Sequence, residues 1–179
     1  MKNLALLTRK ADKIAYYVST AGAIVSGLIV AFTTIMIFAN VINRQFIGQI
    51  WLFVEEYTAL GMIPMAYLGM AYTLRWNKHI YVDAVITNFS PKTQTIVAIL
   101  VSLFSLIVLV FMIERSWNWF AYTWSGHILS DGPMRTPLWL FSLSVVIGLI
   151  MYFFDTLFFM INKILLLIGS TTTLEFHEE

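Results

Sequence analysis

The side chains that could perform acid–base or metal chemistry are few in this chain, and their spacing argues against both. Glu55 and Glu56 are adjacent, so on a helix they point about 100° apart and cannot serve one role. Neither His79 nor His127 has a histidine or cysteine three or four residues away, so neither fits a helical site built on paired histidines, for a metal or for haem. The chain contains no cysteine, no glycine-rich phosphate loop and no nucleophile motif. We therefore predict a protein that is not an enzyme and holds no cofactor or metal.

Four apolar stretches must position these side chains, and each is long enough to cross a membrane. A hydrocarbon core about 30 Å thick needs roughly 20 residues of helix. The chain is 59% hydrophobic and 12% charged, which leaves too little polar surface for a soluble protein of 179 residues. The sequence predicts an all-α integral membrane protein with a single membrane domain over residues 1–179. Its four transmembrane helices are expected at about 14–42, 51–74, 91–117 and 137–161.

The positive residues predict how these helices are oriented, because Lys and Arg near helix ends resist translocation. With the N-terminus inside, only Arg44, Arg115 and Arg135 of the 11 Lys and Arg residues fall on the outer side. Both termini are therefore predicted to face the cytoplasm. The formal net charge of +1 gives no indication of a nucleic-acid partner.

The inner connection between the second and third helices has a pattern of its own. Val82, Val85, Ile86 and Phe89 recur at near-helical spacing beside polar residues. This pattern predicts a short amphipathic helix at about 82–89 on the cytoplasmic surface of the membrane.

The depth of the ionisable groups distinguishes a carrier from a supporting protein. Glu55 lies 20 residues before Arg75, which is roughly 30 Å along a helix, so both glutamates lie near the outer border. No acid or base falls clearly at the midplane, where ion-coupled carriers keep polar groups or broken helices. Only Pro64 offers a discontinuity there. We predict helix-end ion pairs or subunit contacts at Glu55, Glu56, Glu114 and Asp155, with one of the adjacent glutamates binding Arg44 and the other facing a neighbouring helix or subunit.

Small residues recur at every fourth position of the first helix. Such a stripe lets another helix approach closely, because helices associate within lipid by packing. The predicted packing residues are Ala15, Ser19, Ala23, Gly27 and Ala31. The sequence leaves open whether the packing partner belongs to this chain.

Aromatic residues are concentrated in the outer connection between the third and fourth helices. Trp117, Trp119, Phe120, Tyr122 and Trp124 fall within eight residues, which is typical of an interfacial aromatic belt. A docking role for another protein is the alternative interpretation.

A family resemblance rests on motifs at the outer and inner ends of the first two helices. Arg44-Gln45-Phe46 is followed by Trp51, by Glu55-Glu56, by Gly69 and by the run 75–83, Arg-Trp-Asn-Lys-His-Ile-Tyr-Val-Asp. In order and spacing these residues resemble the DctQ-type small membrane subunit of tripartite ATP-independent periplasmic (TRAP) transporters. The resemblance is best from about 41 to 91.

This resemblance implies an auxiliary subunit in a bacterial cell inner membrane rather than the carrier itself. In such a system a large membrane subunit binds substrate and sodium, and a periplasmic binding protein delivers an organic anion. The small subunit is then a static, multi-pass scaffold. The substrate is expected to be sialic acid or a dicarboxylate, with sialic acid preferred on overall similarity alone. Candidate docking residues for the binding protein are Arg44, Arg115, Trp117, Trp124 and Arg135.

Two other classes of function remain open at this point. A self-sufficient small carrier or channel would need a polar path through its own helices, and the sequence offers only Asn40, Asn43, Ser102, Ser105 and scattered threonines. A membrane anchor of a redox complex would need paired histidines in facing helices. Neither requirement is met by the sequence.

Overall fold

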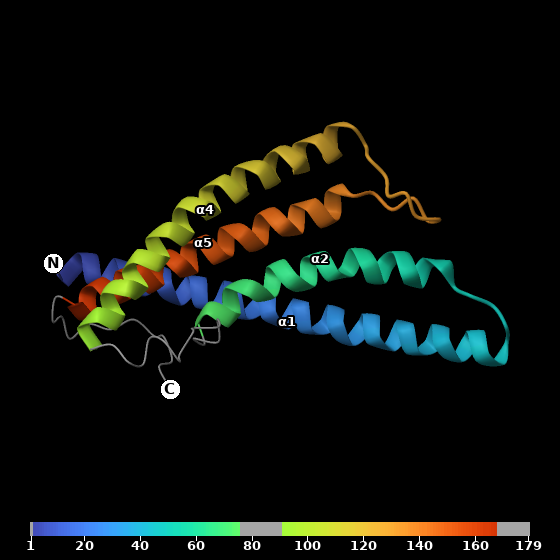
Figure 1. Cartoon of the computed structure of the whole chain (residues 1–179), viewed down its shortest axis with the longest axis horizontal. Helices are drawn as coiled ribbons and strands as arrows, with labels where there is room; N and C mark the ends of the chain where they lie inside the picture. Colours follow the sequence, from blue (N-terminus) through green and yellow to red (C-terminus); the bar gives the residue numbers. More distant parts are fainter. Residues whose placement is uncertain (1, 76–90, 168–179) are drawn as a thin grey trace.

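The computed structural model describes residues 2–75 and 91–167, and that part of the chain consists of four helices (Figure 1). Helix α1 spans Lys2–Phe46, α2 spans Leu52–Arg75, α4 spans Pro91–Ser125 and α5 spans Trp139–Leu167. The described residues contain no strand, only a single bridge between Leu129 and Pro137. The predicted all-helical class is therefore confirmed, whereas the surface helix predicted at 82–89 lies outside the described residues.

Three of the helices are long and apolar enough to cross a membrane. The qualifying segments are Asp12–Phe46, Thr93–Ser125 and Trp139–Leu165. Helix α2, which carries glutamates in its first turns and Gly61, Pro64 and Gly69 further on, is not among them. The chain is an integral membrane protein on these grounds.

The helices extend beyond the apolar stretches that predicted them. Helix α1 begins at Lys2, and α4 continues through the tryptophans to Ser125. Helix formation depends on backbone conformation rather than on apolarity, and the first strong breaker after α4 is Gly126. Gly48 lies in the turn between α1 and α2. Its φ is +77°, in the left-handed region that glycine occupies without steric penalty.

The helices form two antiparallel hairpins that pack against each other. Helix α1 packs on α2, α4 packs on α5, and the two hairpins meet where α2 packs on α5, with α1 also touching α5. In the order α1, α2, α5, α4 each helix packs on the next, so α1 and α4 are the helices at the two edges. Both hairpin loops lie at one end of the molecule, and the N-terminus lies at the other (Figure 1). This end with the two loops is called the loop end below.

Two glycines let neighbouring helices approach α2 backbone to backbone, Gly148 between the two hairpins and Gly22 within the first hairpin. A Cβ added at Gly148 of α5 would lie 2.4 Å from the Tyr67 carbonyl oxygen of α2, and one at Gly22 of α1 would lie 2.7 Å from that of Leu68. Apolar side chains fill the space beside these contacts, centred on Leu109, Val145 and Leu149. Helix α2 is therefore held on both sides by close contacts that leave no room for a side chain.

Candidate functional site

A carboxylate from one hairpin binds the loop of the other at the loop end. Glu56, on α2, is only 8% exposed. Its carboxylate accepts a hydrogen bond from the Ser130 hydroxyl, from the Met134 backbone N–H at 2.7 Å, and from the Thr136 backbone N–H at 3.1 Å and hydroxyl at 2.6 Å. We call Glu56 and these four donors the Glu56 latch. The latch joins the first turns of α2 to the loop between α4 and α5.

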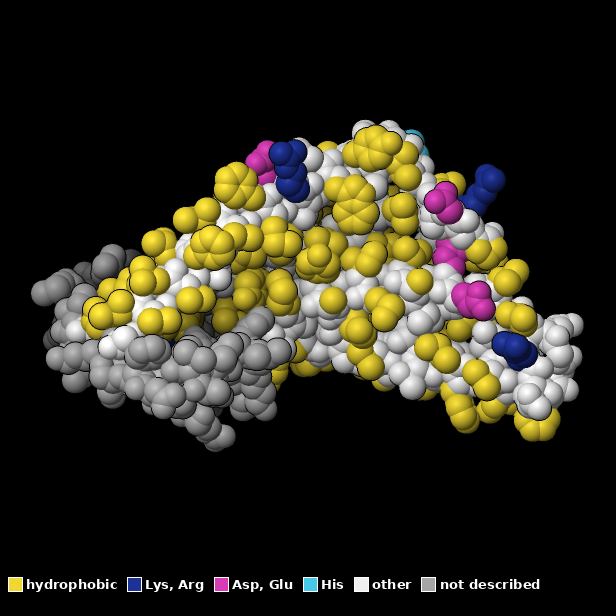
Figure 2. Space-filling model, in the orientation of Figure 1, with side chains coloured by type: hydrophobic (Ala, Val, Ile, Leu, Met, Phe, Trp, Pro, Cys, Tyr) yellow, Lys and Arg dark blue, Asp and Glu magenta, His cyan; other side chains and the backbone are white. Residues whose placement is uncertain are grey.

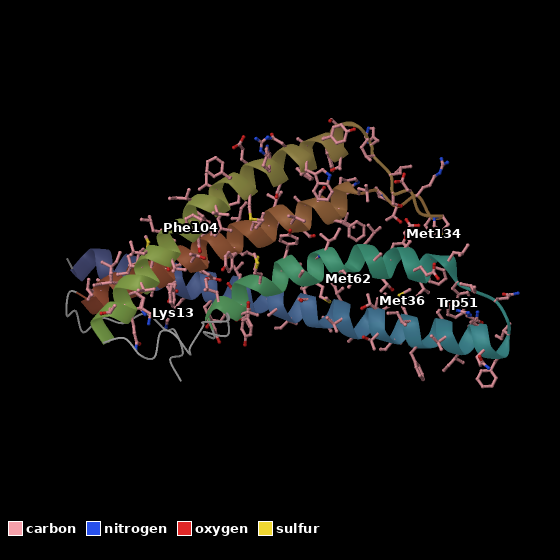
Figure 3. All side chains as sticks on the ribbon, viewed as in Figure 1. Lys13, Met36, Trp51, Met62, Phe104 and Met134 are labelled. Atoms are coloured by element: carbon pink, nitrogen blue, oxygen red, sulfur yellow. The ribbon has the colours of Figure 1, made fainter. Side chains whose placement is uncertain are left out.

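The loop that Glu56 binds is itself tightly folded. The Ser130 N–H donates to the Thr136 carbonyl at 2.8 Å, and the Leu138 N–H donates to the Ile128 carbonyl at 3.1 Å. Gly132 packs directly on the glutamate, since a Cβ there would lie 2.3 Å from a carboxylate oxygen of Glu56. Met134 marks this loop at the loop end, the same end of the molecule as Trp51 and the opposite end from Lys13 (Figure 3). The segment 130–136 is thus a small structured platform rather than a loose connection.

Arg135 is presented outward by this platform in a strained backbone conformation. Its φ is +49°, a region that non-glycine residues rarely occupy, and its side chain is exposed. The residues on either side, Met134 and Thr136, both donate their N–H to Glu56. Strain of this kind persists only where the surroundings hold it and is concentrated at functional sites. The latch therefore fixes the backbone that carries Arg135.

The tryptophan cluster lies on a helix and not in a loop. Because α4 continues to Ser125, the expectation that these aromatic residues lie in the outer connection between the third and fourth helices is wrong. Trp117 contacts Phe120, Phe120 contacts Trp124, and Trp124 meets Trp139 of α5 edge to face with ring centroids 4.9 Å apart. Trp117 and Trp124 nevertheless remain exposed, so they can still contact lipid or a partner.

The helical path of α4 separates two of the three arginines proposed for docking, Arg115 and Arg135. Arg115 lies ten residues before the end of α4, which places it about 15 Å along the axis from the loop that holds Arg135. On the face shown in Figure 2, apart from one acidic and basic pair on α4, the charged side chains gather at the loop end. Arg115 and its exposed neighbour Glu114 are thus set apart from the Glu56 latch.

Arg44 and Glu55 lie together on the other side of α2. Both side chains are exposed and both line a groove of about 420 Å³ between α1 and α2. We call this the outer groove. In the described part of the chain the two side chains form no ion pair with each other, and the predicted binding of Arg44 by one of the adjacent glutamates stays a prediction. The structure does separate the roles of the glutamates, because Glu56 faces the opposite hairpin.

Asp155 is an internal contact between α5 and α1. It is completely buried, and one of its carboxylate oxygens accepts a hydrogen bond from the Ser19 hydroxyl. Of the four acidic residues predicted at helix ends or subunit contacts, Asp155 and Glu56 are therefore turned into the chain, while Glu55 and Glu114 are exposed.

The predicted small-residue stripe of α1 contributes only partly to packing within the chain. Ser19 is buried and Ala15 and Ala23 are half-buried, but Ala31 is exposed and a Cβ at Gly27 would meet nothing within 4 Å. A residue at every fourth position advances by about 40° per step, so the stripe winds away from the interface. Packing of Gly27 and Ala31 on another chain stays a prediction.

The observed contact line of α1 alternates steps of three and four residues. Ser26 donates to the Met65 carbonyl at 2.6 Å, and Ile29 and Thr33 lie beside Gly61. This heptad spacing keeps one face of α1 toward a partner helix. The spacing was not predicted from the sequence, because the residues on that face are mostly polar or small. The line consists of Asp12, Ala15, Ser19, Gly22, Ser26, Ile29, Thr33, Met36, Asn40 and Asn43.

The site offers hydrogen bonding and charge but no catalytic constellation. Within residues 2–75 and 91–167, no group of three or more His, Cys, Asp or Glu side chains could hold a metal ion. All four donors of the Glu56 latch bind the Glu56 carboxylate. The exposed Arg135 lies in the chain between two of the donor residues, Met134 and Thr136. Such an arrangement presents an exposed positive charge on a fixed backbone at the loop end.

Comparison with known proteins gives consistent matches. The family model of the DctQ component of tripartite ATP-independent periplasmic transporters matches residues 33–168, which include the latch and the outer groove. Two similar proteins of Haemophilus influenzae are each provisionally named TRAP transporter small permease protein. One is 26% identical over 150 residues, covering 84% of this chain and 89% of the relative. The other is 27% identical over 104 residues, covering 58% and 65%. No solved structure gives a significant match to this chain.

Proposed function

We propose a function from the premise that this chain belongs to the DctQ family, the small membrane subunits of TRAP transporters. In the proposal it is the non-catalytic scaffold of a sodium-coupled symporter in the bacterial inner membrane. A large membrane subunit moves sodium together with an organic anion, and a periplasmic binding protein delivers that anion. The anion is sialic acid or a dicarboxylate.

The observation that carries the scaffold proposal is the way the two hairpins are joined. The Glu56 latch ties them at the loop end, Gly148 brings the backbone of α5 against α2 further along, and Ser19 of α1 donates to Asp155 of α5. A carrier needs two bodies that move past each other around a central site. A chain fastened at several depths instead supports the role of a fixed support for a moving partner.

The outer surface supports a docking role for the platform at 130–136. Arg135 is held outward by the latch, and exposed charges at an interface steer a partner and raise its association rate. We propose Arg135 as the principal docking residue, with Trp117, Trp124 and Arg115 on α4 as a second, separate contact. Arg44 belongs to the other hairpin and is considered below.

Reconstitution of purified components tests the proposed division of labour. Liposomes that hold this chain alone should take up no organic anion, because the core between the hairpins is built around the apolar side chains of Leu109, Val145 and Leu149. Liposomes that hold it with the large subunit should take up the anion when sodium and the binding protein are both supplied. Uptake of radiolabelled sialic acid and of succinate gives the readout. Uptake by the lone chain would favour the self-sufficient carrier, and a haem spectrum would favour the redox anchor.

We also propose that both termini face the cytoplasm and that α2 crosses the membrane. The chain has no cysteine, so single cysteines report topology directly. Asp131 and Gln49, both exposed, are better sites than Gly132 and Gly48, where a side chain would clash or be strained. Asp131→Cys and Gln49→Cys should react with a membrane-impermeant maleimide in intact cells, and Lys13→Cys only after permeabilisation. Protection of Asp131→Cys in intact cells contradicts the orientation, and opposite accessibility of Asp131→Cys and Gln49→Cys contradicts the crossing of α2.

A further inference from the structure

The outer groove carries two opposite charges that the scaffold role does not use. It is lined on the α1 side by Asn40 and Arg44 and on the α2 side by Glu55 and Thr58. The guanidinium of Arg44 and the carboxylate of Glu55 have no hydrogen-bond or ion-pair partner in the described part of the chain. The Thr58 hydroxyl oxygen is buried there and has no hydrogen-bond partner among the described residues. A charged or buried polar group left unpaired is unfavourable unless water or a ligand satisfies it.

The walls of this groove are fixed by two asparagines of α1. The Asn43 side-chain amide donates to the Gln49 carbonyl at 2.7 Å, and the Trp51 N–H donates to the Asn40 side-chain oxygen at 2.9 Å. These bonds hold the turn between α1 and α2 closed, so the separation of Arg44 from Glu55 is set by the fold. A binding site needs its groups held in place in this way.

The remaining lining residues are apolar, and the groove runs along the axes of α1 and α2. Ile37, Ala59 and Met62 line the part of the groove away from the loop end, and Val41, Ile50 and Val54 line it beside the charged groups. The exposed Trp51 lies beside the groove, since its N–H donates to Asn40. Tryptophan marks the level of lipid headgroups. A groove with both charges at headgroup level and an apolar floor beneath them matches the polarity of a phospholipid along its length.

We infer that the outer groove binds a phospholipid that carries both a phosphate and a primary ammonium group, as phosphatidylethanolamine does. The Arg44 guanidinium, a planar donor, binds the phosphate, the Glu55 carboxylate accepts from the ammonium, and one acyl chain lies on the apolar floor. Phosphatidylcholine has no N–H to donate to Glu55, and phosphatidylglycerol has no positive charge. The inference rests on the membrane placement of α1 and α2 and not on the transport role.

Lipid retention by the full chain tests this inference. The chain is reconstituted in nanodiscs of equal parts phosphatidylethanolamine, phosphatidylcholine and phosphatidylglycerol, extracted in mild detergent, and its bound lipids are counted by native mass spectrometry. We expect phosphatidylethanolamine to be retained roughly tenfold over either other lipid, since one hydrogen bond to a charged group suffices for that ratio. Arg44→Gln and Glu55→Gln should each lower this retention roughly tenfold.

Matched variants on α4 provide the control. Arg115→Gln and Glu114→Gln make the same changes of charge at exposed positions outside the groove, and retention should stay at the level of the unaltered chain. Equal retention of the three lipids, or equal losses in groove and control variants, overturns the inference. If the complex with the large subunit loses the lipid while the lone chain retains it, the groove is a protein interface and the inference is also overturned. Uptake is not part of this readout, so the lipid site can fail while transport is intact.

Discussion

Replacing Glu56 by alanine is expected to release the α4–α5 loop and to lower the free energy of unfolding by about 3 kcal/mol. The change removes the acceptor of four hydrogen bonds and leaves two backbone N–H groups beside a new cavity. Losses of this size are typical when a buried polar network is broken. Denaturant titration in detergent micelles measures the stability, and hydrogen exchange over residues 130–136 measures the loop.

Glu55→Ala is the matched control, because Glu55 is the adjacent residue with the same side chain and is exposed. It should change stability by less than about 0.5 kcal/mol and leave hydrogen exchange in the loop unchanged. Glu56→Gln should fall between the two, since its amide retains one acceptor oxygen. Equal effects of Glu55→Ala and Glu56→Ala would show that the latch does not hold the loop.

Comparing Glu56→Ala with Arg135→Glu separates the structural role of the latch from the proposed docking role of Arg135. In the three-component system, Glu56→Ala should lower uptake at low concentrations of the binding protein because the platform under Arg135 is lost. Arg135→Glu should lower uptake in the same range while leaving stability unchanged, and more binding protein should partly restore it. Unchanged uptake in Arg135→Glu at every binding-protein concentration would remove Arg135 from the docking surface.

Replacing Gly148 by alanine is expected to separate α2 from α5 and to destabilise the chain by about 1–3 kcal/mol. The added Cβ would lie 2.4 Å from the Tyr67 carbonyl oxygen and 2.6 Å from its carbon. These are backbone atoms, so the clash cannot be relieved by a change of rotamer and a helix must move. Thermal unfolding in detergent gives the measurement.

Gly27→Ala is the control for this effect, since a Cβ there meets nothing within 4 Å. Alanine favours the helical backbone over glycine by roughly 1 kcal/mol, so Gly27→Ala should leave the melting temperature unchanged or raise it. A loss in Gly148→Ala no larger than in Gly27→Ala would contradict the close approach of α2 and α5. Loss of the large subunit from Gly27→Ala alone would instead identify the exposed part of the α1 stripe as a subunit contact.

The local features of this fold could be predicted from the sequence because they depend on neighbouring residues. Apolar runs of sufficient length predicted the helices. The family could be recognised because its motifs lie in short segments at the helix borders. Each of these signals is contained within a few residues.

The contacts that make the candidate site could not be predicted in this way. Glu56 and its partners Ser130 and Thr136 are 74 and 80 residues apart, and Ser19 and Asp155 are 136 apart. No spacing rule connects such positions, because their proximity depends on which helices pack together. The contact line of α1 follows alternating steps of three and four residues, a pattern that is present in the sequence. Several of its residues, such as Asn40 and Thr33, are polar, so apolar periodicity does not identify the line.

The distance in sequence between Glu56 and its donors also sets a condition on how the protein is made. Thr136 is synthesised 80 residues after Glu56, which at 5–20 residues per second is a delay of roughly 4–16 s. On the proposed topology, in which α2 crosses the membrane, the first hairpin enters the bilayer during that interval with a carboxylate that has none of its final partners. At the border of the membrane, water can solvate this group until the second hairpin arrives, whereas at the centre it would oppose insertion. On that topology, the position of Glu56 in the first turns of α2 therefore favours membrane insertion as well as the finished fold.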